Sequence, residues 1–251
     1  MQVGGELRIT TGHNETDPRG NITRIKPGED AGKPAFALDV SALGGMYAGK
    51  IIMEGTEKGV GVRNAGELGA MAGTLSLRAD GQLVNSGVLA GQGDLSVAAK
   101  GDLRNTGSLT AGGDVELTAP GTLNNEGIIR GGQDVRLTAA GIHSSEKSTL
   151  LAGAPAATTD GRKGDLVLTS GGELKARGQN KAAGKIVASG TGVDVSGSRT
   201  EAKAVTLTAT ERGISTAGAE LRGQDIVSLR AATGIDNTAG RVSGGRLTIH
   251  S

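Results

Sequence analysis

Apolar and polar residues recur with a period of 20 residues through the middle of the chain. When successive blocks are aligned from Thr74, three columns of like residues appear: Leu75, Leu95, Val115 and Val135; Leu77, Val97, Leu117 and Leu137; and Gly81, Gly101, Gly121 and Gly141. Self-similarity at a fixed period of this length is the signature of stacked repeats. The pattern therefore predicts a solenoid rather than an ordinary globule.

Within each block the apolar residues alternate with polar ones, as in Leu75-Ser76-Leu77. A period of two is typical of a strand with one buried face, whereas a helix needs spacings of three and four. Two further short apolar pieces follow in each block, separated by turn-forming segments such as Asn85-Ser86-Gly87 and Gly91-Gln92-Gly93. Three strands and three corners make one rung of an all-β, right-handed parallel β-helix with about 20 residues per rung. The whole chain should hold about 11 or 12 such rungs.

Asparagines stand at one corner of successive rungs, each two residues before a glycine: Asn64, Asn85, Asn105 and Asn125, with Asn237 in a more distant copy of the pattern. An amide both donates and accepts hydrogen bonds. Stacked at the strand spacing of about 4.8 Å, such amides can bond to one another along the column. Asparagine is also a common turn residue, but we expect a structural ladder here. Nothing in the pattern indicates catalysis.

The chain divides into four regions of different texture. Residues 1–50 should form the first rung or rungs, interrupted by a polar stretch from 13 to 32 that is too long for a corner and predicts an extra-helical hairpin or loop. Residues 51–152 are regular β-helix repeats, 153–164 read as a protruding loop, and 165–251 as less regular rungs. Phe36 and Tyr47, the only aromatic residues, should cover the exposed side of the excursion, with a contact surface as the alternative.

Composition narrows the function classes. Lys plus Arg total 27 against 26 Asp plus Glu, a net charge of +1, so bulk charge does not indicate nucleic acid or an anionic membrane as a partner. The absence of cysteine excludes disulfides and thiolate metal sites. No apolar run approaches the roughly 20 residues of a membrane-spanning helix, and the repeats show no terminal cap, so we expect an internal fragment of a longer chain.

Candidate chemistry along the rungs is sparse. Asp94, Asp114 and Asp134 fall in register, and we interpret them as solvated corner residues, with a shared cation as the less favoured alternative, because one carboxylate per rung is a poor cage for Ca²⁺. Glu116 and Arg136 lie on adjacent rungs and can pair. The three histidines share no register, so no metal ligands, catalytic residues or cofactor are expected.

The segment ALDVSALGGMYAGKIIMEGTEKGVGVRNAGEL, residues 37–68, strongly resembles the haemagglutinin repeat region of filamentous haemagglutinin and of contact-dependent growth inhibition exoproteins. The pieces at 44–50 and 59–64 are the specific part. The resemblance implies a long bacterial surface filament, exported by two-partner secretion through an outer-membrane transporter that the family engages with an N-terminal domain not evident here. It implies a host or neighbouring bacterial cell surface as target, with glycan among the candidates, and no membrane insertion. Both branches share the repeats, so the resemblance does not choose between adhesion and toxin delivery.

The leading functional hypothesis is a structural shaft that holds a distal adhesive or toxin region away from the producing cell. A polysaccharide-acting β-helix enzyme is the rival from another class, but it needs a carboxylate cluster on one face, generally with aromatic rings to stack sugars, and the rod lacks those rings. A third hypothesis gives the segment its own receptor binding through residues 10–50 or the 153–164 loop.

Overall fold

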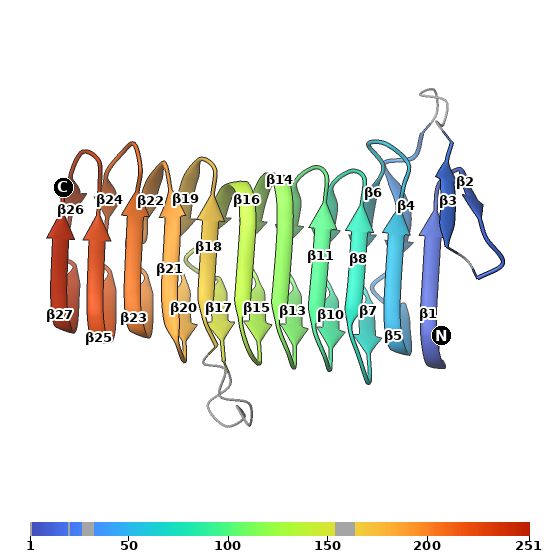
Figure 1. Cartoon of the computed structure of the whole chain (residues 1–251), viewed down its shortest axis with the longest axis horizontal. Coiled ribbons are helices and arrows are strands. Elements are labelled where there is room, and N and C mark those ends of the chain that lie inside the picture. Colours follow the sequence, from blue (N-terminus) through green and yellow to red (C-terminus); the bar gives the residue numbers. More distant parts are fainter. Residues whose placement is uncertain (1, 20, 27–32, 154–163) are drawn as a thin grey trace.

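The computed structural model describes residues 2–19, 21–26, 33–153 and 164–251. Of their strands, 25 form one continuous stack (Figure 1). The predicted all-β parallel solenoid is confirmed, with about ten turns of roughly 21 residues each. The winding is right-handed, with the N-terminal turn at one end of the stack and the C-terminal turn at the other. Turns number fewer than predicted because those after Leu7 and Val135 contain many more residues than the others.

Three parallel ladders form the three faces of the solenoid, and consecutive strands along the chain pass from one ladder to the next. Ladder A contains β1 (Gln2–Thr11), β5 (Gly45–Gly55), β8 (Leu75–Ala79), β11 (Leu95–Ala99), β14 (Val115–Asn125), β16 (Val135–Ser144), β18 (Leu166–Ser170), β21 (Lys185–Gly190), β23 (Arg199–Ala209), β25 (Glu220–Arg230) and β27 (Arg241–His250). Ladder B contains β4 (Phe36–Val40), β6 (Gly61–Asn64), β9 (Leu83–Asn85), β12 (Leu103–Asn105), β19 (Glu173–Ala176), β22 (Gly192–Asp194), β24 (Ile214–Ser215) and β26 (Ile235–Asp236). Ladder C contains β7 (Glu67–Ala70), β10 (Val88–Gly91), β13 (Ser108–Ala111), β15 (Ile128–Gly131), β17 (Thr149–Ala152) and β20 (Gln179–Ala182).

The longest strands bend around a corner and serve two ladders. The end of β14 and the end of β16 join ladder B, while the beginnings of β1, β5, β23, β25 and β27 join ladder C. Register shifts mark these bends, for example between Ala119 and Thr122 of β14.

Pairing between turns brings equivalent residues of the repeat together. Leu95 lies between Leu75 and Val115, and Val115 pairs in turn with Val135, as the sequence alignment predicts. The aliphatic side chains of these columns point inward and are almost completely buried, including Leu77, Leu103, Leu117 and Leu137 at 0% exposure. A narrow interior filled by aliphatic side chains has little room for aromatic rings, which accounts for their scarcity.

The predicted excursion after the first strand is also present. β2 (Asn14–Thr16) and β3 (Ile22–Ile25) form a two-stranded antiparallel sheet that stands apart from the 25-stranded stack. Thr56 ties its base to the solenoid, because its hydroxyl contacts the Asn14 side chain at 2.6 Å and the Thr11 carbonyl at 3.0 Å. Of the loop predicted at 153–164, residues 154–163 lie outside the described residues.

Truncating a core residue should destabilise the stack locally. Replacing Leu103, which is 0% exposed, with alanine should lower the free energy of unfolding by about 2 to 5 kcal/mol, because a cavity remains where the turn cannot collapse. Urea unfolding followed by circular dichroism measures this change. Arg104→Ala, an outward substitution on the same strand, serves as the control, and equal effects of the two substitutions would contradict the inward packing of Leu103.

Candidate functional site

The four asparagines singled out in the sequence lie directly above one another at the corner between ladders B and C. The side-chain NH₂ of Asn64 donates to the Asn85 carbonyl oxygen, Asn85 donates to Asn105, and Asn105 donates to Asn125, each at 2.8 Å. All four are at most 1% exposed. Each NH₂ of the first three also approaches main-chain carbonyls of the corner, such as those of Gly107 and Ile128 around Asn105.

The glycines two residues further on explain the rest of this corner motif. A Cβ added at Gly87, Gly107 or Gly127 would lie 2.0 to 2.1 Å from a carbonyl oxygen of the preceding turn. Only a residue without a side chain lets the backbones of consecutive corners approach this closely. The Asn-x-Gly pattern therefore combines a side chain that bonds along the column with a position that has no room for one.

The same column continues toward the C-terminus with other residues. The Asn125 NH₂ donates to the Ser144 hydroxyl at 3.2 Å, and Ser144 pairs with Ala176 on the next turn. Val195 and Thr216 follow at equivalent positions, and the Thr216 hydroxyl donates to the Asn237 side chain at 2.7 Å. Asn237 thus occupies the column but is separated from Asn125 by turns with small or apolar residues.

Phe36 and Tyr47, the candidate contact residues, lie on different ladders. Phe36 begins β4 in ladder B, where the Arg63 guanidinium carbon lies 5.1 Å from its ring centre. Tyr47 projects from β5 in ladder C, and its ring lies against Gly69. A hydrogen bond with the Glu67 carboxylate raises the pKa of the Tyr47 hydroxyl. Both rings thus contact residues of solenoid strands, and the two residues lie on different ladders.

The aspartates that fall in register make a second polar column, at the corner before ladder A. Asp94 accepts a hydrogen bond from the Asp114 main-chain N–H, Asp114 from that of Asp134, and Asp134 from that of Asp165, at 2.8 to 2.9 Å. Each carboxylate thus accepts a donor from the next turn, which simple solvation of a corner does not provide. Arg136, the expected partner of Glu116, pairs with Asp134. The described residues contain no group of three or more His, Cys, Asp or Glu placed to hold a metal ion.

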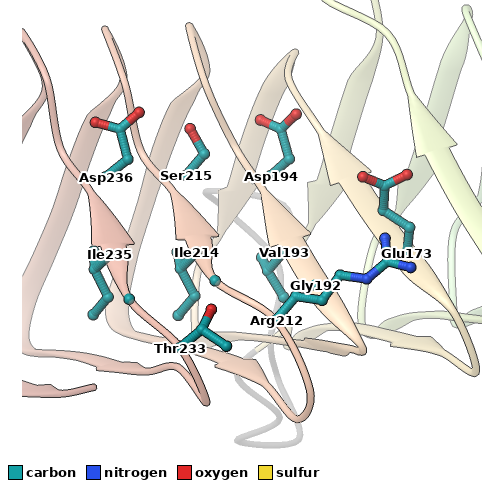
Figure 2. A pocket seen from close by; sticks show the side chains of 12 residues that line it. Glu173, Gly192, Val193, Asp194, Arg212, Ile214, Ser215, Thr233, Ile235 and Asp236 are labelled. Carbon is teal, nitrogen blue, oxygen red and sulfur yellow. The ribbon is translucent and has the colours of Figure 1, made fainter.

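A groove of about 540 Å³ lies on the outer face of ladder B near the C-terminal end. Its floor includes Gly192, Gly213 and Gly234, which occupy equivalent outward positions on three successive turns. Asp194, Ser215 and Asp236 stand in line along one side, and Figure 2 shows them pointing the same way. Arg212 lies on the other side, where its stem crosses Gly192 and its guanidinium is directed toward Glu173.

Sequence reasoning missed this groove, although a signal exists. The tripeptides Gly192-Val193-Asp194, Gly213-Ile214-Ser215 and Gly234-Ile235-Asp236 repeat the pattern glycine, aliphatic, Asp or Ser. The aliphatic residue packs inward, while the glycine and the polar residue face out. These tripeptides recur every 21 residues, which differs from the 20-residue register of the central blocks.

Asp194, which lines the groove, forms an ion pair with Arg177. Burial alone raises the pKa of the Asp194 carboxyl, but hydrogen bonds from Arg177 and Ser196, together with the Arg177 charge, lower it overall. The Arg177 Nε lies 3.0 Å from the Asp194 carboxylate. Asp236 is similar, since hydrogen bonds from the Thr238 side chain and main chain lower its pKa. Both carboxylates are therefore ionised at neutral pH.

The similarity of this chain to known proteins lies in the same repeats. The haemagglutinin repeat family model matches residues 55–87 and 70–178. The chain is a member of the haemagglutinin-repeat family. No solved structure matches it, and no helix among the described residues is long and apolar enough to span a membrane.

Curated relatives of this haemagglutinin-repeat chain include the tRNA nuclease CdiA-2 of Burkholderia pseudomallei (strain 1026b), which is 49% identical over 241 residues, or 95% of this chain and 8% of that protein. Toxin CdiA of Yersinia pestis is 52% identical over 85 residues, covering 34% of this chain and 3% of that protein. The tRNA nuclease CdiA of Escherichia coli (strain STEC_O31) is 42% identical over 86 residues, with coverage of 34% and 3%. The chain thus spans less than a tenth of each of these proteins, and the resemblance to contact-dependent inhibition proteins is confirmed.

Removing one amide should weaken the asparagine column. Asn105→Ala deletes two buried side-chain hydrogen bonds and leaves the Asn125 oxygen without its donor, so the free energy of unfolding should fall by about 2 to 4 kcal/mol. Asn124→Ala, which alters an outward asparagine one residue before the column, is the matched control. Chemical unfolding of both variants tests this, and a loss below that of Asn124→Ala would show that the amides act only as turn residues.

Acid should selectively weaken the turn that carries Asp194. Because the folded-state pKa of Asp194 lies below its ordinary value, its contribution to stability is present above about pH 4 and is lost as the pH falls through the folded-state pKa. Thermal unfolding of the protein should therefore show a greater loss of midpoint over this range than unfolding of Asp194→Asn. An unchanged slope in Asp194→Asn would refute the assignment.

Proposed function

We propose that this chain is part of the shaft of a secreted bacterial surface protein of the contact-dependent inhibition branch, in which it spaces a toxin-bearing region from the producing cell. The relatives named above support this branch, since each carries the CdiA name and is called a toxin or a tRNA nuclease. The observation that carries the proposal is the in-register stack of about ten turns. At about 4.8 Å per turn, it extends the polypeptide by roughly 48 Å.

The geometry suits a spacer for a mechanical reason. Every turn between the two ends of the stack is hydrogen-bonded to the turns on both sides and shares a continuous aliphatic core with them. Bending the rod would open main-chain hydrogen bonds on one side, so the stack resists bending while its surface stays free to vary. Adhesion in the manner of haemagglutinins is the second candidate, and the name of the family model favours it.

The partners in this proposal are an outer-membrane transporter of the two-partner secretion type and the surface of a target cell. The segment itself acts by length and rigidity rather than by catalysis. We assign the nuclease activity in the names of the relatives to parts of those proteins outside the portion that this chain matches, which is at most 8% of their length. The expected location is the outer surface of the producing cell.

Deletion of whole turns tests the spacer role. Removing residues 95–134 from the full-length protein joins Asp94 to Val135 and preserves the register of every remaining turn, so export and growth inhibition of target cells should continue, with a shaft shortened by about 10 Å. Removing residues 95–125 brings unlike corners together and should abolish export, because core residues and turn residues then share columns.

Surface display can be measured directly because the chain has no cysteine. Labelling of exposed Thr169→Cys on intact cells with a membrane-impermeant maleimide reports whether the shaft lies outside. The proposal fails if the whole-turn deletion is displayed normally but no longer inhibits targets, since the removed turns would then supply more than length. Labelling that requires cell lysis would contradict the location.

A further inference from the structure

The groove on ladder B is not required by a shaft. Stacking needs the inward residues Val193, Ile214 and Ile235, whereas the outward glycines beside them add nothing to the core. Earlier in the same outward column stand Asp102, Thr122, Gly141 and Glu173, so three of these four turns carry a side chain at this position. The space above Gly234 is open, because a Cβ added there would meet no atom within 4 Å. The hollow therefore arises where three successive turns carry glycine in this column.

The groups that border the hollow repeat with the turns. Asp194, Ser215 and Asp236 offer carboxylate, hydroxyl and carboxylate along one side, while the Thr233 hydroxyl and the Arg212 guanidinium stand opposite (Figure 2). Both sides thus carry hydrogen-bonding groups, and the row along one wall advances by about 4.8 Å per turn. A row of polar groups with a regular period fits a ligand that is itself a polymer with a similar period.

The spacing between turns distinguishes an extended peptide from a glycan as the linear ligand. Side chains on one face of an extended peptide repeat at about 6.6 Å, twice the rise per residue, which falls out of step with the turns. A hexose unit in an extended glycan advances by nearly one rung, so successive sugars can present their hydroxyls to successive turns. Carboxylates, hydroxyls and guanidinium groups are suitable partners because sugar hydroxyls both donate and accept.

The charges of the lining residues indicate which class of glycan the groove suits. The lining holds three carboxylates, Glu173, Asp194 and Asp236, and one guanidinium. Asp194 is already paired with Arg177 and Glu173 with Lys175, so the hollow has no excess positive charge to attract a sulfated or uronic-acid chain. Its polar walls and open shape (Figure 2) also suit a small apolar ligand poorly.

We propose that this groove binds a neutral glycan, laid along the solenoid axis across the turns that carry Gly192, Gly213 and Gly234. The Asp236 carboxylate accepts hydrogen bonds from sugar hydroxyls, and the Ser215 hydroxyl donates to them. The Arg212 guanidinium contacts the opposite edge of the glycan. The absence of side chains at Gly213 and Gly234 lets the rings approach the main chain, whereas the Arg212 stem covers Gly192. This inference does not rest on the shaft role, because a spacer functions whether or not the groove is occupied.

The test is a titration of the purified chain with short oligosaccharides of glucose, galactose or N-acetylglucosamine. Binding is measured through the shifts of the Gly213 and Gly234 amide signals in NMR spectra. At least one neutral series should give saturable shifts confined to the groove. Gly234→Leu fills the hollow without a clash at its Cβ and should weaken binding about tenfold or more, which corresponds to about 1.4 kcal/mol. Asp236→Ala should also weaken it.

Gly5→Leu is the matched control, since a Cβ at Gly5 also meets no atom within 4 Å and this residue lies at the opposite end of the solenoid; it should bind as the unaltered chain does. The proposal is overturned if no neutral oligosaccharide gives saturable shifts, or if Gly234→Leu binds normally. Stronger binding of a sulfated oligosaccharide, or of an extended peptide, would also overturn it. Circular dichroism of every variant confirms that loss of binding is not loss of fold.

Discussion

Parallel, in-register hydrogen bonding between successive turns is the constraint on which the rest of this structure depends. Because each turn lies directly on the one before, every residue meets its equivalent at about 4.8 Å. The side chains of a column must therefore pack against, or bond to, equivalent side chains of the neighbouring turns. Aliphatic residues do so by packing, amides by donating and accepting, and corner glycines by leaving room for a neighbouring carbonyl. The in-register aspartates meet this requirement through the main-chain N–H of the following turn, to which each carboxylate bonds.

The same constraint explains how much the sequence predicts. Between Thr74 and Ala139 the period is constant, so the alignment of Leu75 with Leu95 and Val115 directly gives the spatial pairing. The fold class and the excursion before β4 follow from this pattern and from one polar stretch too long for a corner. Beyond Val135 the turns vary in length, and a bend or bulge, such as that between Gly223 and Ile226, absorbs the difference. Periodicity alone cannot place such a shift, because the residues that absorb it carry no fixed signature.

The site could be predicted only in part, for a related reason. The stacking of Asn64 to Asn125 was visible because one residue type repeats, whereas its continuation through Ser144, Ala176 and Val195 changes chemistry at each turn. Phe36 and Tyr47 stand out in the sequence only because aromatic residues are rare, and the corner between β4 and β5 places them on different ladders. The sequence does not single out the groove, because its defining feature is glycine at outward positions. Glycine is abundant throughout this chain, with 45 residues.

A solenoid separates what stabilises it from what it presents outward. The inward columns are nearly uniform from β5 to β25, while the outward face of ladder C changes from residues such as Tyr47, Val88 and Ile128 to the charged pairs formed by Lys181 with Glu201 and Arg199 with Glu220. Exposed pairs of this kind contribute about 0 to 1 kcal/mol each, so their replacement hardly affects the stack. Surface chemistry can therefore vary turn by turn on an unchanged core. A spacer of this design can acquire a binding groove on one face without losing its length or its rigidity.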